Sequence, residues 1–169
     1  MAEKLILLVL IIAANGAPIL ADDLLGRRWA WPIDGGLVFK DGRRLLGSSA
    51  TVRGLVIAVL VAGGLAGLLG HSLWAGVLIG LWAMLGDALS SFVKRRLGLL
   101  PGEMAFGLDQ IPESLLPLLA VAGDYQLGWD DILVLVLGFT LFDLLCGNAP
   151  IDRNAERSLR IGPAGLPGR

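Results

Sequence analysis

The chain has 169 residues, of which 55% are hydrophobic and only 17% are charged, and its mean hydropathy is +0.73. A soluble globular domain carries about 25% charged residues, so this composition excludes an ordinary soluble domain. Its single cysteine, Cys146, excludes an internal disulfide. The apolar residues form long blocks, which predict one transmembrane domain over residues 1–169. We expect no nucleic-acid partner.

Five apolar blocks follow one another, and we predict an all-α fold with about five transmembrane helices. They cover about residues 5–20, 55–69, 73–89, 111–122 and 132–145. A helical crossing needs roughly 20 residues, with about 17 as a practical minimum. The second, fourth and fifth blocks reach this length only with flanking residues, and the fourth can be tilted or partly re-entrant.

The first block contains two residues that are unusual in an apolar helix, Asn15 and Pro18. Both suit a functional or kinked membrane helix better than a signal peptide. An asparagine in lipid must find polar partners. Asn15 therefore either makes an interhelical hydrogen bond or lines a polar cleft.

Lysines and arginines concentrate in three segments, which are about residues 21–54, 92–110 and 147–169. The connections around His71 and over residues 123–131 carry none. Basic residues mark the cytoplasmic side of a membrane protein. We therefore predict an outside N-terminus, with the two loops and the tail in the cytoplasm.

The first cytoplasmic loop is rich in turn signals. Asp-Gly and Gly-Gly pairs mark tight turns, and residues 37–44 with the Asp41-Gly42 turn predict a short hairpin over the membrane surface. Residues 47–51 then form a glycine-serine stretch before a helix, where backbone N–H groups can face an anion. The stretch lacks the Gly-Lys-Ser/Thr ending of a P-loop.

The third predicted helix ends with a polar face. Its members are spaced i, i+3, i+4 and i+7 and are Asp87, Ser90, Ser91 and Lys94. On the functional interpretation, Asp87 binds Mg²⁺, a serine donates to phosphate, and Lys94 with Arg95 or Arg96 neutralises phosphate. The alternative is a snorkelling Lys-Arg-Arg anchor at a capped helix end.

A second acidic residue, Asp109, precedes the fourth predicted helix. It is either an N-terminal cap or a second metal ligand that the loop containing Pro101-Gly102-Glu103 and Gly107 brings near Asp87. The sequence leaves both interpretations open.

Glycines recur four residues apart in the second and third predicted helices. The pairs are Gly63 with Gly67, and Gly76 with Gly80. Such spacing lets two helix backbones approach closely in lipid. It predicts that these helices pack together, and a glycine-lined passage for a lipid tail is the alternative.

Several segments share their order and spacing with a known family. They are residues 15–18, 32–36, 41–47, 51–54, Gly86-Asp87, 91–96, Pro101-Gly102, Asp109-Gln110 and 154–162. Together they span almost the whole chain and resemble the CDP-archaeol synthase family of CTP-dependent lipid-phosphate cytidylyltransferases. The motif on the third helix is also similar to that of CDP-diacylglycerol synthases.

The resemblance implies a Mg²⁺-dependent membrane enzyme whose partners are CTP and a lipid phosphate, either an archaeal-type ether lipid phosphate or a phosphatidic-acid-like lipid. Its products would be a CDP-lipid and pyrophosphate. The resemblance also implies that the two cytoplasmic loops form a polar cleft, so the active site of this cell (inner) membrane protein would face the cytoplasm. Asp87 and Asp109 would hold the metal and, with Lys94, carry catalysis. The implied nucleotide- and phosphate-binding residues are Ser90, Ser91, Arg95, Arg96, Thr51, Arg53, Arg43 and Arg44. Further cleft candidates are Asn15, Asp34 and Asp41.

The chain departs from the family at one position. A Lys-Thr pair usually leads into the second helix, whereas this chain has Ala50-Thr51. Because alanine cannot contact phosphate, a nearby cation such as Lys40 or Arg53 substitutes, or enzyme activity is altered or absent. The alternative function is a non-catalytic membrane relative that binds nucleotide or anionic lipid without turnover.

Overall fold

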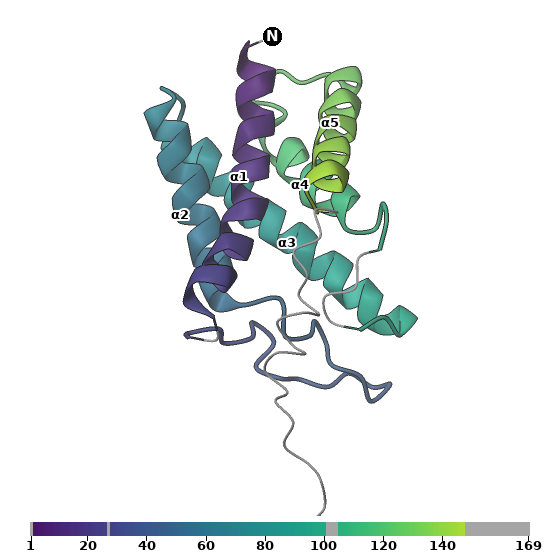
Figure 1. The fold of residues 1–169 in the computed structure, drawn as a ribbon. Coiled ribbons are helices and arrows are strands. Elements are labelled where there is room, and N and C mark those ends of the chain that lie inside the picture. The colour runs from purple at the N-terminus through teal and green to yellow at the C-terminus, as the bar shows by residue number, and fades with distance from the viewer. Residues whose placement is uncertain (1, 27, 101–104, 148–169) are drawn as a thin grey trace, which may run out of the picture.

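The computed structural model describes residues 2–26, 28–100 and 105–147, and these ranges contain five α-helices and no β-sheet (Figure 1). The helices are α1 (Ala2–Leu25), α2 (Val52–Leu68), α3 (Leu73–Leu97), α4 (Gln110–Val121) and α5 (Trp129–Gly147). Each predicted apolar block corresponds to one of them. Arg27, the Pro101-Gly102-Glu103 motif and the tail after residue 147 lie outside the described residues.

The helices differ in whether their length suits a membrane crossing. Among the described residues, α1 and α3 are long and apolar enough to cross a bilayer. The 12 residues of α4 extend about 18 Å, less than the roughly 30 Å hydrocarbon core of a bilayer. The five predicted helices are therefore confirmed, whereas five full crossings stay a prediction.

The outer faces of the helices carry many large apolar side chains. On α5, Leu133, Val134, Leu137 and Leu141 are all strongly exposed, and α1 exposes Leu20 in the same way. A soluble monomer rarely leaves apolar surface this extensive. Exposure of this kind is typical of helices that face lipid.

Close packing of α2 against α3 confirms the prediction drawn from their glycines. A Cβ atom on Gly76 would lie 2.4 Å from the carbonyl oxygen of Ala62, and one on Gly80 would lie 2.8 Å from that of Ala58. These distances are far below van der Waals contact. Only glycine therefore permits the observed approach of the two backbones.

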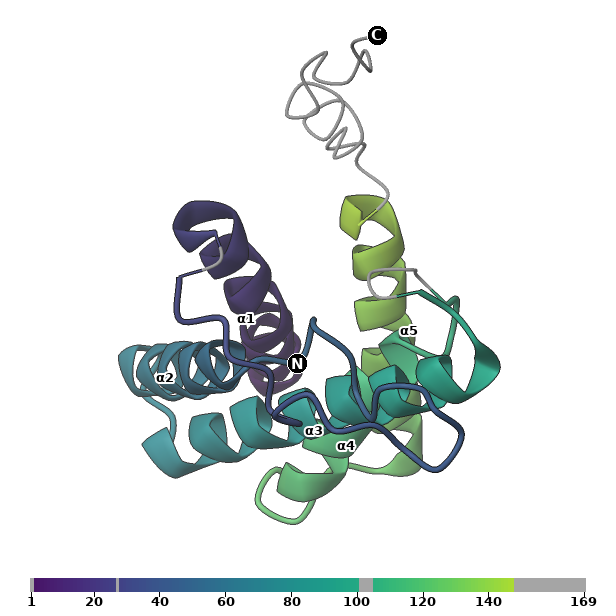
Figure 2. The same ribbon diagram turned by 90° about the horizontal axis from the view of Figure 1, so that it is seen from below.

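The two charged loops lie at the same end of the helix bundle, and Figure 2 shows the first loop crossing that end over α3. At the opposite end, Lys4 of α1 pairs with Asp131 of α5. There too, the Tyr125 hydroxyl lies 3.3 Å from Nδ1 of His71 and links the two connections that lack basic residues. The two basic loops thus lie at one end and the two connections without basic residues at the other, as the topology predicts. Which end faces the cytoplasm stays a prediction.

Candidate functional site

The structure brings together three of the predicted residues, Asp87, Lys94 and Asp109, at the charged end of the bundle. Lys94 is buried near the end of α3, and its Nζ lies 2.8 Å from Oδ1 of Asp109. Asp87 lies two turns earlier on the same face of α3 and interacts electrostatically with both of these groups. Two elements that are separated in sequence thus meet in one cluster of opposite charges.

Gly86 explains how α4 comes so close to this part of α3. A Cβ atom on Gly86 would lie 2.4 Å from the carbonyl oxygen of Pro112 and 2.8 Å from the Cα atom of Glu113. The first turn of α4 therefore packs directly on the α3 backbone. This contact sets the distance between Asp87 and the start of α4, where Asp109 lies.

Asp109 does not cap α4, so the first of its two sequence interpretations is wrong. Its side chain makes no capping hydrogen bond to the helix. Instead, Oδ2 accepts a hydrogen bond of 3.0 Å from the backbone N–H of Ala105, while Oδ1 faces Lys94. The carboxylate is thus turned toward α3.

The two serines of the polar face are buried in α3. The Ser90 hydroxyl donates a hydrogen bond of 2.9 Å to the backbone carbonyl of Asp87. The hydroxyl has a single proton, and this hydrogen bond within α3 uses it. We therefore assign Ser90 to the local structure of α3 in place of the expected phosphate contact.

Three polar residues near this cluster had no predicted role: Gln110, Glu113 and Asp143. The Gln110 Nε2 group donates a hydrogen bond of 2.8 Å to Oδ2 of Asp143 on α5. Glu113 interacts electrostatically with Asp87, Asp109 and Asp143. One sequence signal could have identified Asp143, because a carboxylate within an apolar membrane block is costly and usually functional.

The carboxyl groups of this cluster suit a divalent cation. Among the described residues, no group of three His, Cys, Asp or Glu side chains is arranged to hold a metal alone. Mg²⁺ does not require such a cage, because it is commonly held by one or two carboxylates together with waters and substrate phosphates. Asp87 and Asp109, whose charges lie close enough to affect each other, would be the two carboxylates of such a site.

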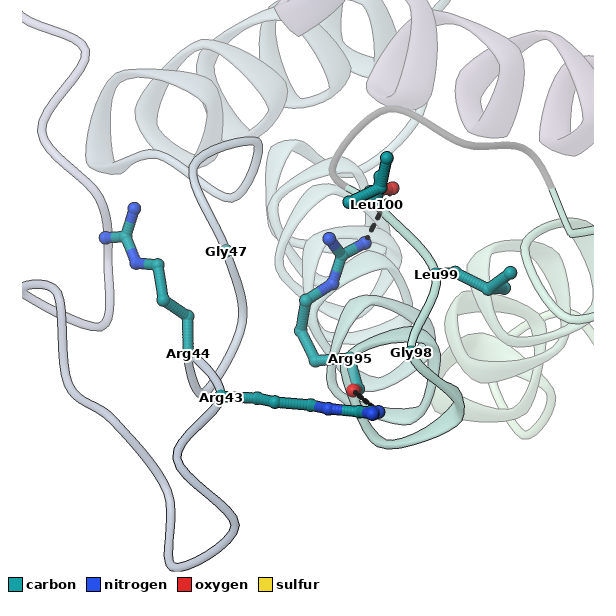
Figure 3. A pocket seen from close by; sticks show the side chains of 7 residues that line it. All are labelled: Arg43, Arg44, Gly47, Arg95, Gly98, Leu99 and Leu100. Atoms are coloured by element: carbon teal, nitrogen blue, oxygen red, sulfur yellow. Dashed lines mark hydrogen bonds between the residues drawn. The ribbon is translucent and has the colours of Figure 1, made fainter.

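A pocket of about 350 Å³ lies between the first loop and the end of α3. Its lining residues are Arg43, Arg44, Gly47, Arg95, Gly98, Leu99 and Leu100. Figure 3 shows the Arg95 side chain reaching from α3 toward Leu100, where Nη2 donates a hydrogen bond of 3.2 Å to the carbonyl oxygen. Within the described part of the chain, Nε and Nη1 of this buried side chain have no hydrogen-bond partner. The pocket therefore offers unused cationic donors to an anion.

Arg43 closes the end of α3. Its Nη1 donates hydrogen bonds of 3.1 Å and 3.0 Å to the carbonyl oxygens of Arg95 and Arg96. The Arg95 carbonyl also accepts a hydrogen bond of 3.3 Å from the backbone N–H of Gly98, so Arg43 adds a second donor at a helix end where carbonyls lack their usual i+4 partners. Gly98, with φ of +83°, ends the helix in the left-handed conformation, and a Cβ there would lie 3.0 Å from Nη1 of Arg43.

The predicted hairpin is confirmed by an antiparallel bridge between Val38 and Arg44, and Arg96 attaches it to α3. The Arg96 guanidinium lies 4.7 Å from the ring centroid of Phe39 and 5.0 Å from that of Phe92. It also pairs with Asp41 at 3.2 Å. These contacts hold the loop against α3, and the site roles expected of Arg96 and Asp41 stay predictions.

Thr51 and Arg53 join the ends of α1 and α2. Thr51 caps α2, since its Oγ1 accepts a hydrogen bond of 3.1 Å from the N–H of Gly54. Arg53 is buried, donates to the carbonyl of Gly26 at 3.0 Å and pairs with Asp22. Both side chains thus have structural partners, while the phosphate contacts expected of them stay predictions.

Asn15 has a local partner. Its Nδ2 donates a hydrogen bond of 3.0 Å to the carbonyl oxygen of Ile11 one turn earlier in α1. The described contact is thus intrahelical, in contrast to the interhelical hydrogen bond considered from the sequence.

Asp34 is the buried anchor of the first loop. Its carboxylate accepts hydrogen bonds from the backbone N–H groups of Gly36, Leu46 and Gly47, and Arg44 lies 3.4 Å away. Burial alone would raise the pKa of Asp34, but these hydrogen bonds and the Arg44 charge hold the pKa below its usual value. We assign Asp34 to the shape of the loop in place of a cleft role.

This environment predicts that acid loosens the first loop. A carboxyl whose pKa is lowered by folding stabilises the folded state above its unfolded pKa of about 4, and this contribution is lost as the pH falls through the lower folded value. We expect Asp34→Ala to cost about 1–3 kcal/mol, since it leaves buried N–H groups without an acceptor, and to remove this acid sensitivity. Limited proteolysis of the loop between pH 3 and 7 would measure both effects. Asp23→Ala, at an exposed position of α1, is the control and should change neither.

Comparison with known proteins identifies the family. A family model described as CarS-like, CDP-archaeol synthase, matches residues 65–152. The CDP-archaeol synthase of Pyrobaculum arsenaticum is 41% identical over 111 residues, which cover 63% of this chain and 66% of that protein. The CDP-archaeol synthase of Methanopyrus kandleri is 49% identical over 88 residues, which cover 47% of this chain and 50% of that protein. The chain thus matches half to about two thirds of the length of these curated relatives.

A solved structure agrees with this assignment. It is an intramembrane enzyme for archaeal membrane lipids biosynthesis, similar to this chain with a TM-score of 0.74 and 30% sequence identity. The similarity covers 87% of this chain and 94% of the solved chain. The family model matches more than half of the chain and includes Asp87, Lys94 and Asp109. The chain is therefore an integral membrane protein that belongs to the CDP-archaeol synthase family.

Proposed function

We propose that this chain is a CTP-dependent cytidylyltransferase that converts a lipid phosphate to a CDP-lipid and pyrophosphate. One observation carries the proposal: the Asp87–Lys94–Asp109 cluster and the arginine-lined pocket occupy the same end of α3. In this proposal, carboxylate donors for a cation and cationic donors for phosphate act at the same end of α3. The names of the relatives support this activity.

In the proposed reaction, an oxygen of the lipid phosphate attacks the α-phosphorus of CTP, and pyrophosphate leaves from the opposite side. No covalent enzyme intermediate is needed, so positioning and charge neutralisation provide most of the catalysis. Asp87 and Asp109 would hold Mg²⁺, which neutralises phosphate charge when bound. Lys94 orients Asp109 through their 2.8 Å ion pair and adds a positive charge to the site.

The lipid substrate is proposed as an archaeal-type ether lipid phosphate, because the curated relatives are named CDP-archaeol synthases. The exposed apolar faces of the helices suit a substrate whose chains stay in the bilayer. A phosphatidic-acid-like lipid has the same phosphate headgroup and is the alternative substrate. The proposed site faces the cytoplasm, because basic loops are typical of the cytoplasmic side of a membrane protein.

Ala50 supports the second candidate function, a non-catalytic relative that binds without turnover. Ala50 is buried, Arg53 binds the Gly26 carbonyl at the end of α1, and Lys40 is exposed on the hairpin, so we propose that neither cation substitutes for the missing lysine. Arg95 is the better substitute, because two of its donor atoms are unused. Ala50 thus raises the possibility of a non-catalytic relative, whereas the unused donors of Arg95 favour the enzyme.

The experiment that tests the function uses detergent-purified protein with Mg²⁺, labelled CTP and a panel of ether and ester lipid phosphates. A labelled CDP-lipid would establish the activity and name the lipid class. CTP binding without any product would favour the non-catalytic relative, and Ala50→Lys would then be expected to create turnover.

We expect Arg95→Ala to raise the KM for the phosphate substrate that occupies the arginine-lined pocket by about 10-fold or more, since a charged hydrogen bond contributes roughly 1.5–3 kcal/mol. Arg95→Lys should recover only part of the affinity, because lysine lacks the planar fork of donors. The control Arg28→Ala removes an exposed arginine from the same loop region. Equal KM values for Arg95→Ala and the control would exclude this pocket from substrate binding.

A further inference from the structure

We infer that Asp143 on α5 is a positioning residue for Asp109 and acts through the side-chain amide of Gln110. The inference rests on the proposed function for its catalytic readout, but its structural readout is independent of turnover. It begins with Gln110, which is completely buried at the start of α4. A buried amide must be hydrogen-bonded at both ends, because each unpaired end is costly.

The two partners of the Gln110 amide are of opposite type. Its Oε1 accepts a hydrogen bond of 2.8 Å from the backbone N–H of Gly107, and its Nε2 donates one of 2.8 Å to Oδ2 of Asp143. A backbone N–H can only donate, and an ionised carboxylate can only accept. Asp143 therefore selects one of the two flip states of the amide, the one in which the oxygen faces Gly107.

This amide orientation fixes the turn that carries Asp109. Gly107 has φ of +76°, and the N–H of Asp109 donates a hydrogen bond of 3.1 Å to the carbonyl oxygen of Ala105. Within the same turn, Oδ2 of Asp109 accepts from the N–H of Ala105, which leaves Oδ1 directed at Lys94. The hydrogen bond from Gln110 to Asp143 thus determines the direction in which the Asp109 carboxylate points.

The electrostatic surroundings agree with a positioning role. Asp143 and Asp109 both interact with Glu113, so α5 contributes one carboxyl group to the acidic side of the site. The position of Asp143 near the C-terminal end of α5 brings it to the charged end of the bundle, away from the Lys4–Asp131 pair at the start of that helix. Asp143 is a contact through which α5 reaches the start of α4.

The test replaces the acceptor while keeping the size of the side chain. Asp143→Leu removes the acceptor, and Asp143→Asn keeps an oxygen that can accept from Gln110. We expect Asp143→Leu to lower turnover about 10- to 100-fold, as loss of an outer hydrogen bond to a ligand typically does, and to increase the Mg²⁺ requirement. Asp143→Asn should retain most of the activity. Thr140→Val is the matched control one turn earlier on α5.

Hydrogen–deuterium exchange of residues 105–110 provides the readout that does not depend on activity. Exchange should accelerate in Asp143→Leu and remain as in the unaltered protein in Asp143→Asn and Thr140→Val. Unchanged exchange in Asp143→Leu, or equal impairment in Asp143→Leu and Asp143→Asn, would overturn the inference. If the unaltered protein makes no CDP-lipid, the proposed function fails and the exchange result alone decides the positioning role.

A second pair of substitutions, which exchanges the amide and the carboxylate, tests the same hydrogen bond if Asp143→Leu does not fold. Gln110→Glu places two carboxylates against each other and should impair the protein, because neither can donate. Adding Asp143→Asn restores a donor opposite Glu and should recover protection of residues 105–110 and turnover. A double variant no better than Gln110→Glu alone would contradict the proposed hydrogen bond.

Discussion

Asp87→Asn is expected to abolish nearly all CDP-lipid formation. The substitution removes the negative charge that faces Lys94 and Asp109 while preserving the size of the side chain. Loss of a residue that stabilises charge in the reacting complex typically lowers the rate by about 10²–10³-fold, and a metal ligand should be at the upper end. A 10³-fold loss corresponds to about 4 kcal/mol of transition-state stabilisation.

Initial rates with labelled CTP at saturating lipid phosphate measure this loss, and size-exclusion chromatography verifies that the variant is folded. The control is Asp124→Asn, which removes an exposed carboxylate at the opposite end of the bundle. The control should have normal rates. Retention of turnover by Asp87→Asn would rule out the proposed metal-binding role of this carboxylate. Loss of turnover with CTP binding retained is the result that the enzyme hypothesis requires.

Gly86→Ala is expected to impair both stability and catalysis. Its Cβ would lie 2.4 Å from the carbonyl oxygen of Pro112, and this neighbour is backbone that cannot rotate away. Overpacking of this kind typically costs about 1–3 kcal/mol. The first turn of α4 must move away from α3, and a shift of about 1 Å at a catalytic group can lower the rate about 10²-fold.

Thermal unfolding in detergent and the turnover rate together test this prediction. Gly64→Ala is a matched control, because a Cβ at this position of α2 meets nothing within 4 Å. Alanine is the better helix former by about 0.5–1 kcal/mol, so the control should be as stable as the unaltered protein or more stable. If Gly86→Ala behaves like this control, close packing of α4 on α3 does not set the geometry of the site.

Local sequence patterns predicted the helices and one face of the site. The apolar blocks identified all five helices, and the spacing of Asp87 and Lys94 placed both side chains on one face of α3. The glycine spacing correctly predicted the contact of α2 with α3. These features depend on residues a few positions apart, so helical periodicity alone determines them.

The roles of the loop residues could not be predicted in the same way. Arg43, Arg53 and Arg96 have the same chemistry as Arg95, and all four were assigned to phosphate. In the folded chain, the first three bind carbonyls, carboxylates or aromatic rings, whereas Arg95 lines the pocket with two donor atoms that have no hydrogen-bond partner among the described residues. Which partner an arginine meets depends on contacts between segments distant in sequence, and composition carries no information on those contacts.

The sequence by itself determined that this chain is a helical membrane protein with an acidic and basic cluster at the end of its third helix, because hydropathy and helical spacing are local properties. Only the tertiary structure decided that Asp109 faces Lys94 instead of capping α4, and that Gln110 joins Asp143. The physical reason lies at Gly86, where close backbone packing brings α4 onto α3. That approach sets which carboxyl groups share one site.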